Sequence, residues 1–471
     1  MNAVPSFVVV GHPNKGKSSI VATLASDDSV AIGPEPGTTT VCREYPMRVD
    51  NICLYVLIDA PGFQRSRRAL EWLSRTTSSP AGRPEAVRNF IQDPEAKLKC
   101  PDECEILKPI VDGAGILYVV DGSVPYGPEY AAELEILQWT GRPRMALINP
   151  IQSEEHVDEW RKALGQYFSL VRVFNPTKAS FEKQIELLQA FGELEEVWKP
   201  QIQEAIKVLT ASRSKRLPLI AGEIAETIVR MLEHTIEEKI SDDQENLDQL
   251  RKKIEARFLG DLRAIEGQLR KKVEELCDYF RLAREELELD VLEPEFLFSE
   301  ESWRLFGLSR TEVLTYSALG GSVVGGSVDA VTGGASLFAG AIIGGIVGVV
   351  TAAFSAQQLI QAKVISIPLG KKLLVSGPIK QLSFPHLVFN RARLHYFILS
   401  RRTHARRDVL KLDRDATRVN GMEELSRAQR DELERAFSRI RSGGILRLSS
   451  EESLKEVVLK ILRDDNPQSG N

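Results

Sequence analysis

Eight consecutive residues near the beginning of the chain have the types and spacing of a phosphate-binding loop. They are Gly11, His12, Pro13, Asn14, Lys15, Gly16, Lys17 and Ser18, and Ser19 follows them. The backbone N–H groups of such a loop surround phosphate oxygens at the start of a helix, where the helix dipole also favours an anion. Lys17 would supply a cation to the β- and γ-phosphates, and the Ser18 hydroxyl would be a ligand of Mg²⁺. The loop therefore predicts a phosphate and Mg²⁺ site.

The residues on either side of this loop predict the elements that must position it. Phe7–Val10 is a short apolar run typical of a buried strand, and Ser18–Leu24 is typical of the start of a helix. Strand, loop and helix in this order are the context in which the motif binds phosphate. We therefore expect an α/β domain over residues 1–200, followed by a mostly α-helical C-terminal half.

Two later motifs could complete the site. Thr39 stands about twenty residues after Ser18, behind a Pro-Gly pair, where its hydroxyl can reach Mg²⁺ and its backbone the γ-phosphate. A further apolar strand ends in Asp59-Ala60-Pro61-Gly62, in which Asp59 would hold Mg²⁺ through water and the Gly62 N–H would contact the γ-phosphate. Alone, that tetrapeptide is also typical of a turn after a strand. Together, the three motifs indicate a triphosphate site.

The same three motifs resemble those of the Era, EngA and TrmE group of translation-factor-related GTPases, over roughly the first 180 residues. The resemblance implies that Lys17 and Ser18 bind phosphate and magnesium, that Thr39 is the switch I threonine, and that Asp59 and Gly62 are the switch II pair. It also implies hydrolysis of GTP to GDP and phosphate as a conformational switch. In this interpretation the residues that act on the triphosphate are Lys17, Thr39, Gly62 and Asn14.

The residue after Gly62 suggests how the γ-phosphate would be hydrolysed. Residue 63 is phenylalanine, where Ras-like enzymes have the glutamine that orients water. This resembles the hydrophobic-substituted GTPases, which often place K⁺ where an arginine finger would lie, held partly by the loop asparagine. Asn14 is at that position, so the resemblance implies slow, K⁺-stimulated turnover. The alternative is that Asn14 is a turn residue that fits the loop backbone.

The element that should recognise the base departs from the family. After the strand Met145–Ile148 the family has Asn-Lys-x-Asp, but this chain has Asn149, Pro150, Ile151 and Gln152. The Gln152 amide could accept a hydrogen bond from guanine, although without the charge of a carboxylate. Guanine nucleotide is therefore implied by the resemblance and not by these residues.

About fifty residues separate Gly62 from the next expected strand, Gly115–Asp121. A switch II helix needs far fewer residues, so we expect an insertion over about 64–110, with a helical pattern around Trp72. A long segment at this place is a candidate contact for an effector, and a solvated insertion is the alternative.

The overall composition narrows the class of protein. With 471 residues, 43% hydrophobic and 27% charged, most of the chain should be globular. A net charge of −5 gives no general attraction to nucleic acid or to an anionic bilayer. Five scattered cysteines fit a reducing compartment. No cationic segment with an apolar core precedes the loop, so we expect a cytoplasmic protein.

Long helices are predicted after the nucleotide domain, as a stalk or bundle over 201–311. Apolar residues recur at steps of three or four from Leu247 to Phe280, which predicts one helix from Asp242 to Glu288. A second stripe could pack antiparallel to it, formed by Ile220, Ile224, Ile228, Met231, Ile236 and Ile240. A homodimer formed through this stalk or through the nucleotide domain is a sharper interpretation of the same pattern.

Residues 312–362 form a glycine-rich apolar segment in which Asp329 is the only charged residue between Glu312 and Lys363. Glycines at 340, 344 and 348 would line one ridge of a helix, as in closely packed membrane helices. Two interpretations stay open. Residues 313–357 could form a hairpin that enters the inner face of the cell membrane, or a tightly packed helix pair in a soluble α-domain.

The C-terminal region, 363–471, is predicted to be basic and helical, with one or two amphipathic helices over 417–462. The basic residues that gather there are Arg391, Arg393, Arg401, Arg402, Arg406, Arg407 and Lys411. They could contact anionic lipid or RNA, or they could be paired inside the fold. Together with Ser302–Leu308 and His404–Asp408, this layout resembles a bacterial GTPase family with a C-terminal domain of unknown function.

These observations predict a GTPase switch whose helical half responds to the nucleotide. The partner is open between a membrane, through 313–357, and RNA or the ribosome, as for an assembly GTPase. A nucleotide-binding scaffold with little turnover is the third interpretation.

Overall fold

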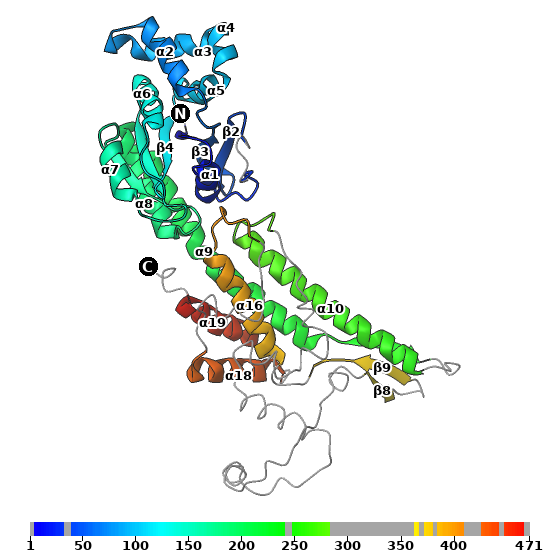
Figure 1. Ribbon diagram of the computed structural model, residues 1–471. Coiled ribbons are helices and arrows are strands. Elements are labelled where there is room, and N and C mark those ends of the chain that lie inside the picture. The colour runs from blue at the N-terminus through cyan, green and yellow to red at the C-terminus, as the bar shows by residue number, and fades with distance from the viewer. Residues whose placement is uncertain are drawn as a thin grey trace. The chain divides into compact units, whose positions relative to one another are not determined.

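The computed structural model describes residues 4–32, 39–240, 247–282, 362–366, 372–379, 384–408, 425–441 and 447–465. The chain divides into two compact units (Figure 1). The first unit comprises Met1–Arg216 with two later segments, Cys277–Ala283 and Leu399–Leu410. The second comprises Leu217–Leu276, Arg284–Ile398 and Lys411–Asn471. The nucleotide motifs all lie in the first unit.

A six-stranded sheet forms the centre of the first unit, in the order β2-β3-β1-β4-β5-β6. The strands are β1 (Ser6–Val10), β2 (Arg43–Val49), β3 (Ile52–Asp59), β4 (Gly115–Asp121), β5 (Arg144–Asn149) and β6 (Leu170–Val173). Strand β2 is antiparallel to β3, and the other neighbours are parallel. Parallel strands covered on both faces appear in a sequence as continuous apolar runs, which is why β1 and β4 could be predicted. The α/β prediction is confirmed.

Helices cover both faces of this sheet. Val8 and Val10 of β1 pack in the core beneath α2 (Ser66–Thr76), α6 (Ala131–Trp139) and α7 (Val157–Leu164). Phe7 and Val9 point to the opposite face, beneath α1 (Lys17–Ala25) and α8 (Phe181–Leu194). The ring centroids of Phe7 and Phe191 on that face are 4.5 Å apart. Packing on both faces holds β1, and therefore the loop that follows it, in place.

The insertion predicted after Gly62 is helical and packed. It contains α2, a 3-10 turn (η1, Pro80–Gly82), α3 (Arg83–Gln92), α4 (Pro94–Lys99) and α5 (Pro101–Val111). Asp93 caps α4 by accepting the N–H of Ala96 at 2.7 Å. Leu73, Phe90 and Leu107 are fully buried in the same core as β1 and β4. The insertion is therefore part of the core, and the interpretation as a merely solvated segment is wrong.

The second unit combines long helices with a small sheet. Helix α9 (Lys199–Glu233) begins in the first unit and continues into the second, which also contains α10 (Leu247–Leu276). An antiparallel sheet has the order β7-β9-β8, with β7 (Ile236–Ile240), β9 (Lys372–Ser376) and β8 (Lys363–Ser366). Among the residues described here, the second unit also contains α16 (Phe384–Ser400), α18 (Arg427–Arg441) and α19 (Arg447–Asp465).

Three predictions for this region are corrected. Ile236 and Ile240 belong to β7 and not to a helical stripe, because they pair with β9, far along the chain. The long helix ends at Leu276 and not at Glu288, because Asp278 takes a left-handed φ of 64°. The region after residue 363 contains β8 and β9 as well as helices.

The basic cluster is largely paired inside the fold. In the second unit, Arg391 Nε donates to Glu266 Oε1 at 2.7 Å, and Arg393 Nε donates to Asp465 Oδ2 at 2.6 Å. In the first unit, Arg402 Nη1 donates to Asp408 Oδ2 at 3.2 Å. For these arginines the interpretation as an open surface for lipid or RNA is wrong.

The glycine-rich segment 312–362 lies outside the described residues except for its final alanine. Within the part of the chain that the structure describes, no helix is both long enough and apolar enough to cross a membrane.

Candidate functional site

The phosphate-binding loop joins β1 to α1 and depends on glycine at two places. Gly11 has a φ of 141°, and a Cβ there would lie 2.3 Å from the Val119 carbonyl oxygen. Gly16 has a φ of 86°, and a Cβ would lie 2.4 Å from Asn149 Nδ2. Asn14 also takes a left-handed φ, of 59°. These positive φ angles turn the chain back toward α1, whose N-terminus favours an anion.

Lys17 is buried along this loop, with 7% of its surface exposed. Its Nζ donates to the carbonyl oxygens of Gly11 at 3.2 Å and His12 at 3.0 Å. Burial lowers the pKa of Lys17 to about 8, although Asp59 and Glu133 act in the opposite direction. A bound phosphate would add negative charge beside the ammonium group, so nucleotide binding should raise this pKa again.

The three predicted Mg²⁺ residues converge from α1, the end of switch I and β3. Ser18 Oγ donates to Asp59 Oδ2 at 2.8 Å, and Thr39 Oγ1 donates to the same oxygen at 3.0 Å. Asp59 is 2% exposed, and burial raises its pKa. Its other oxygen, Oδ1, is buried without a hydrogen-bond partner among the described residues. Converging oxygen donors with one unsatisfied carboxylate oxygen fit a magnesium ion.

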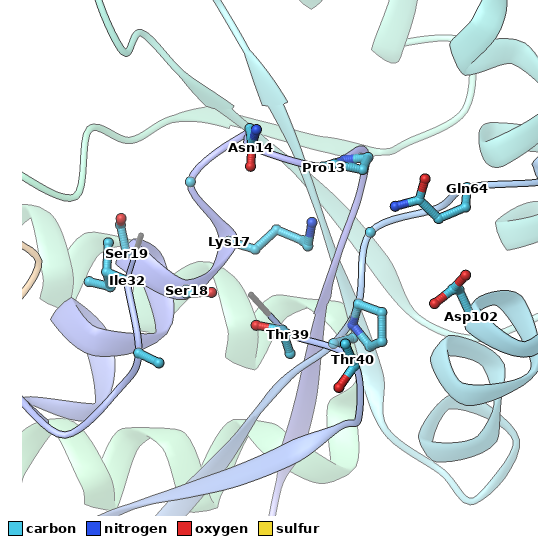
Figure 2. Close-up of a pocket in the computed structure, with 15 residues that line it drawn as sticks. Pro13, Asn14, Lys17, Ser18, Ser19, Ile32, Thr39, Thr40, Gln64 and Asp102 are labelled. Atoms are coloured by element: carbon cyan, nitrogen blue, oxygen red, sulfur yellow. The ribbon is translucent and has the colours of Figure 1, made fainter. Parts of the chain in front are cut away.

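A pocket opens over these groups (Figure 2). Loop, switch and insertion residues line it: Pro13, Asn14, Gly16, Lys17, Ser18, Ser19, Ala31, Ile32, Thr39, Thr40, Ala60, Pro61, Gly62, Gln64 and Asp102. The structure therefore brings most of the predicted phosphate and magnesium residues to one place. Sequence reasoning missed Gln64 and Asp102. Gln64 could have been found because it follows Phe63, whereas nothing local points to Asp102.

The loop after β3 is pressed against the phosphate-binding loop. A Cβ on Gly62 would lie 2.7 Å from the Pro13 nitrogen, so only glycine fits there without displacement. The N–H of Phe63 donates to the Gly11 carbonyl oxygen at 3.2 Å, and the Phe63 side chain is 1% exposed. Phe63 is therefore a core residue that cannot contact water in the pocket.

His12 faces away from the pocket, toward α6. Its Nδ1 lies 2.9 Å from Glu133 Oε1, and Tyr118 Oη donates to Glu133 Oε2 at 2.9 Å. Glu133 is 1% exposed, and burial raises its pKa. The His12 side chain therefore joins the loop to α6 and is not among the residues that line the pocket.

The residues predicted to read the base lie apart from this pocket. Asn149 is 3% exposed, and its Nδ2 donates to the Lys15 carbonyl oxygen at 3.1 Å, while Lys15 Nζ lies 3.7 Å from Asp121 Oδ2. Asn149 and Lys15 thus brace the loop. Gln152 is exposed and is not among the residues that line the pocket.

Two segments from the C-terminal part of the chain pack at the start of switch I, within the first unit. The Asp28 carboxylate accepts the N–H groups of Phe280, at 2.7 Å, and of Arg281. Arg407 donates to the carbonyl oxygens of Asp28 and Val30, both at 2.7 Å. Sequence reasoning gave no hint of these contacts.

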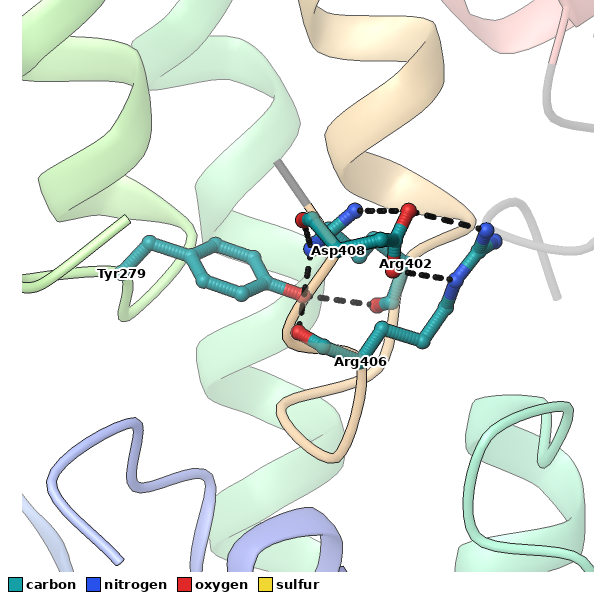
Figure 3. A network of polar contacts seen from close by, with 4 residues as sticks. All are labelled: Tyr279, Arg402, Arg406 and Asp408. Atoms are coloured by element: carbon teal, nitrogen blue, oxygen red, sulfur yellow. Dashed lines mark hydrogen bonds and ion pairs between the residues drawn. The ribbon is translucent and has the colours of Figure 1, made fainter. Parts of the chain in front are cut away.

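A polar network stiffens these two segments (Figure 3). Tyr279 Oη donates to the Arg402 carbonyl oxygen at 2.9 Å, and its ring stacks on His404 with centroids 4.3 Å apart. Arg406 Nε donates to Asp408 Oδ1 at 3.3 Å. Burial alone would raise the pKa of Asp408, but Arg402 and Arg406 lower it overall. Asp408 therefore forms ion pairs with both arginines.

Comparison with known proteins finds a family match for each of two parts of the chain. A family described as "Domain of unknown function (DUF3482)" matches residues 161–460, and one described as "50S ribosome-binding GTPase" matches residues 6–149. GTPase Der of Lactobacillus helveticus is 39% identical over 70 residues, which are 15% of this chain and 16% of Der. The tRNA modification GTPase MnmE of Pseudothermotoga lettingae is 26% identical over 160 residues, which are 34% of this chain and 29% of MnmE.

The chain therefore spans less than a third of the length of these curated relatives. Among solved structures, Era of Aquifex aeolicus bound to GDP and AlF4⁻ aligns with 58% of this chain and 89% of its own, at 16% identity and a TM-score of 0.28. The family match to residues 6–149, on the fold described above, identifies the N-terminal part as a P-loop GTPase domain.

Proposed function

Since the chain belongs to the DUF3482 family and carries a GTPase domain in front of that domain, we propose that it binds GTP and hydrolyses it as a conformational switch. The observation that carries this proposal is the geometry at Asp59. The Ser18 and Thr39 hydroxyls both donate to one oxygen of its buried carboxylate, and the other oxygen has no hydrogen-bond partner among the described residues. Because Thr39 belongs to switch I, its hydrogen bond to Asp59 connects the conformation of switch I to the magnesium site proposed here.

The groups at and beneath the pocket divide the parts of this function among them. Lys17 and the loop N–H groups bind the β- and γ-phosphates, and Ser18, Thr39 and Asp59 would hold Mg²⁺. Magnesium, when bound, neutralises negative charge on the two phosphates. Gly62 lies beside the loop, where its N–H can donate to the γ-phosphate. Loss of the γ-phosphate would break that hydrogen bond and release switch II.

The direct test is nucleotide binding and turnover in purified protein. Lys17→Ala should abolish GTP binding measured by calorimetry, and Asp59→Asn should lower the hydrolysis rate at least a hundredfold. Lys99→Ala is a matched control, because Lys99 is exposed on the insertion and pairs with Glu95 one turn earlier on the same short helix. Tight GTP binding without phosphate release would favour a nucleotide-binding scaffold instead.

The preference for guanine is part of the proposal and rests on the family match. Asn149 is engaged with the loop and Gln152 is exposed, so base recognition should be weaker than with an aspartate. We expect GTP to bind more tightly than ATP, and Gln152→Asp to increase that preference about tenfold. Equal affinity for the two nucleotides, in both proteins, would contradict the proposal.

Potassium is proposed as the cation that assists turnover, because Asn14 lines the pocket and Phe63 cannot orient water. The hydrolysis rate should be higher in KCl than in NaCl. Asn14→Gly removes the side chain but accepts the left-handed φ, so it should remove the difference between the salts and leave GDP affinity unchanged. Identical rates in both salts would exclude this role.

The C-terminal domain is proposed as the part that responds to the nucleotide. The contacts of Arg407 with Asp28 and Val30 lie at the start of switch I, and Ala31 and Ile32 after them line the pocket. A change of switch I between its GTP and GDP forms would therefore strain or relax these hydrogen bonds.

Two partners are favoured by different observations. The apolar segment 313–357, with Asp329 as its only charge, favours a cytoplasmic protein attached to the inner face of the cell membrane. The family description "50S ribosome-binding GTPase" favours the ribosome. Co-sedimentation with liposomes and with ribosomal subunits, in GTP and in GDP, separates them, and deletion of 313–357 should abolish only membrane binding.

A further inference from the structure

Glu103, on helix α5 of the insertion, is a fully buried carboxylate that binds the backbone of switch II. Its Oε1 accepts the N–H of Gln64 at 2.9 Å and the N–H of Arg65 at 2.5 Å. Its exposed fraction is 0%, and Oε2 has no hydrogen-bond partner in the described part of the chain. A buried carboxylate is unfavourable unless it is hydrogen-bonded, so the two backbone N–H groups account for its position.

These bonds fix three consecutive residues of switch II. Phe63 is tied to the phosphate-binding loop through its N–H, and Gln64 and Arg65 are tied to α5. Because the Phe63 side chain is buried, the next side chain, Gln64, is the one that emerges at the pocket. A glutamine therefore reaches the site from a position one residue later than in Ras-like enzymes.

Helix α5 also supplies a second polar group to the same pocket. Asp102, next to Glu103, lines it, and Figure 2 shows Asp102 and Gln64 on the same side, coming from α5 and from the loop after β3. Arg65 Nη1 lies 3.9 Å from Asp102 Oδ2, which limits the charge that Asp102 presents to a phosphate.

The same helix contacts the end of switch I. The N–H of Cys42 donates to Glu105 Oε1 at 3.0 Å, and Cys42 Sγ lies 3.3 Å from the Glu105 carbonyl oxygen. Helix α5 thus contacts the chain just after Thr39 and just after Gly62, the two residues that would touch the γ-phosphate.

We propose that Gln64 and Asp102 orient the water that attacks the γ-phosphate, and that α5 positions Gln64 through Glu103. This inference rests on the proposed GTPase function. The water oxygen forms a bond to Pγ, the bond between Pγ and the β–γ bridging oxygen breaks, and GDP leaves with that electron pair. The Gln64 and Asp102 oxygens accept hydrogen bonds from the water, and its protons end on inorganic phosphate.

The first test separates binding from turnover. Gln64→Ala and Asp102→Asn should each lower kcat ten- to a hundredfold with unchanged affinity for GTP and GDP. Both should also lose affinity for GDP with AlF4⁻, an analogue of the transition state. Gln138→Ala and Asp112→Asn are matched controls, because both side chains are exposed and neither lines the pocket.

The second test concerns the positioning residue. Glu103→Ala should lower kcat as much as Gln64→Ala, and the double variant should lose no more than either alone. Glu103→Gln keeps an acceptor oxygen and should restore most of the activity. Circular dichroism and GDP affinity would show whether each variant is folded.

The outcomes distinguish this inference from the proposed function. If Gln64→Ala and Asp102→Asn keep kcat within about twofold of the wild type, the inference is overturned while the GTPase function stands. If the wild type binds GTP but releases no phosphate, both are overturned.

Discussion

Replacement of Asp28 by alanine should loosen the packing of the segment 277–282 on the nucleotide domain. Asp28 is 9% exposed, and its carboxylate accepts the backbone N–H groups of Phe280 and Arg281. A hydrogen bond to a charged group contributes about 1.5–3 kcal/mol, and alanine also leaves the two N–H groups without an acceptor. Because the buried carboxylate loses its desolvation penalty at the same time, we expect a net destabilisation of about 3 kcal/mol.

The assay is thermal unfolding followed by circular dichroism. For a domain of this size, about 3 kcal/mol lowers Tm by about 6–12 °C. The substitution Asp28→Asn keeps one acceptor oxygen and should cost about half as much. Asp27→Ala is the matched control, since the Asp27 carboxylate accepts the exposed N–H of Ser29, at 2.7 Å, from within its own turn. A Tm change for Asp28→Ala as small as that of Asp27→Ala would refute the reasoning.

The same variant should also affect the nucleotide. Ala31 and Ile32 line the pocket and follow Asp28 closely in sequence. Looser packing at Asp28 should therefore speed the release of a fluorescent GDP analogue, measured by stopped flow. An unchanged release rate, in a protein with the expected lower Tm, would separate the stability of this contact from any role in the switch.

Three other predictions follow from the same structure. Phe63→Ala should leave a cavity and lower the free energy of unfolding by about 3–5 kcal/mol in urea titrations, and a cost under about 1 kcal/mol would show that Phe63 is not packed as described. In the free protein Lys17 loses its proton above about pH 8. Since phosphate binding favours the charged form, GTP affinity should fall by up to about tenfold for each pH unit above that value, with net proton uptake in calorimetry; a flat profile to about pH 9.5 would contradict it. Asp465→Ala should destabilise the second unit by about 3–5 kcal/mol, because it removes the carboxylate that forms a buried ion pair with Arg393, whereas exposed Asp464→Ala should change unfolding little.

Local patterns were sufficient for the central strands and the phosphate-binding loop. Strands β1 and β4 are buried on both faces, so each is a continuous apolar run that needs no partner to be recognised. Gly11 and Gly16 have positive φ angles that favour glycine. Because this requirement is local, the loop could be predicted from a short stretch of sequence. Ser18, Thr39 and Asp59 could be predicted as magnesium ligands because each follows a strand or loop of known type.

Patterns failed where pairing is distant. Ile236 and Ile240 have helical spacing with the residues before them, but they lie in β7, opposite Ser376 and Lys372 of β9. Arg391 and Arg393 form a basic run in sequence, yet both are neutralised by carboxylates from other helices. A run of charge does not indicate which of its members will be buried.

The sequence by itself determined much of the chemistry of phosphate binding, because a loop of eight residues between a buried strand and a helix contains the backbone N–H groups, the lysine and the serine hydroxyl that this chemistry uses. Only the tertiary structure decided which further side chains line the pocket. Gln64 and Asp102 lie far apart along the chain and meet because the insertion packs into the core through Leu73, Phe90 and Leu107. Burial of those apolar side chains supplies the free energy that holds α5 and its carboxylates against both switches, and no local pattern records it.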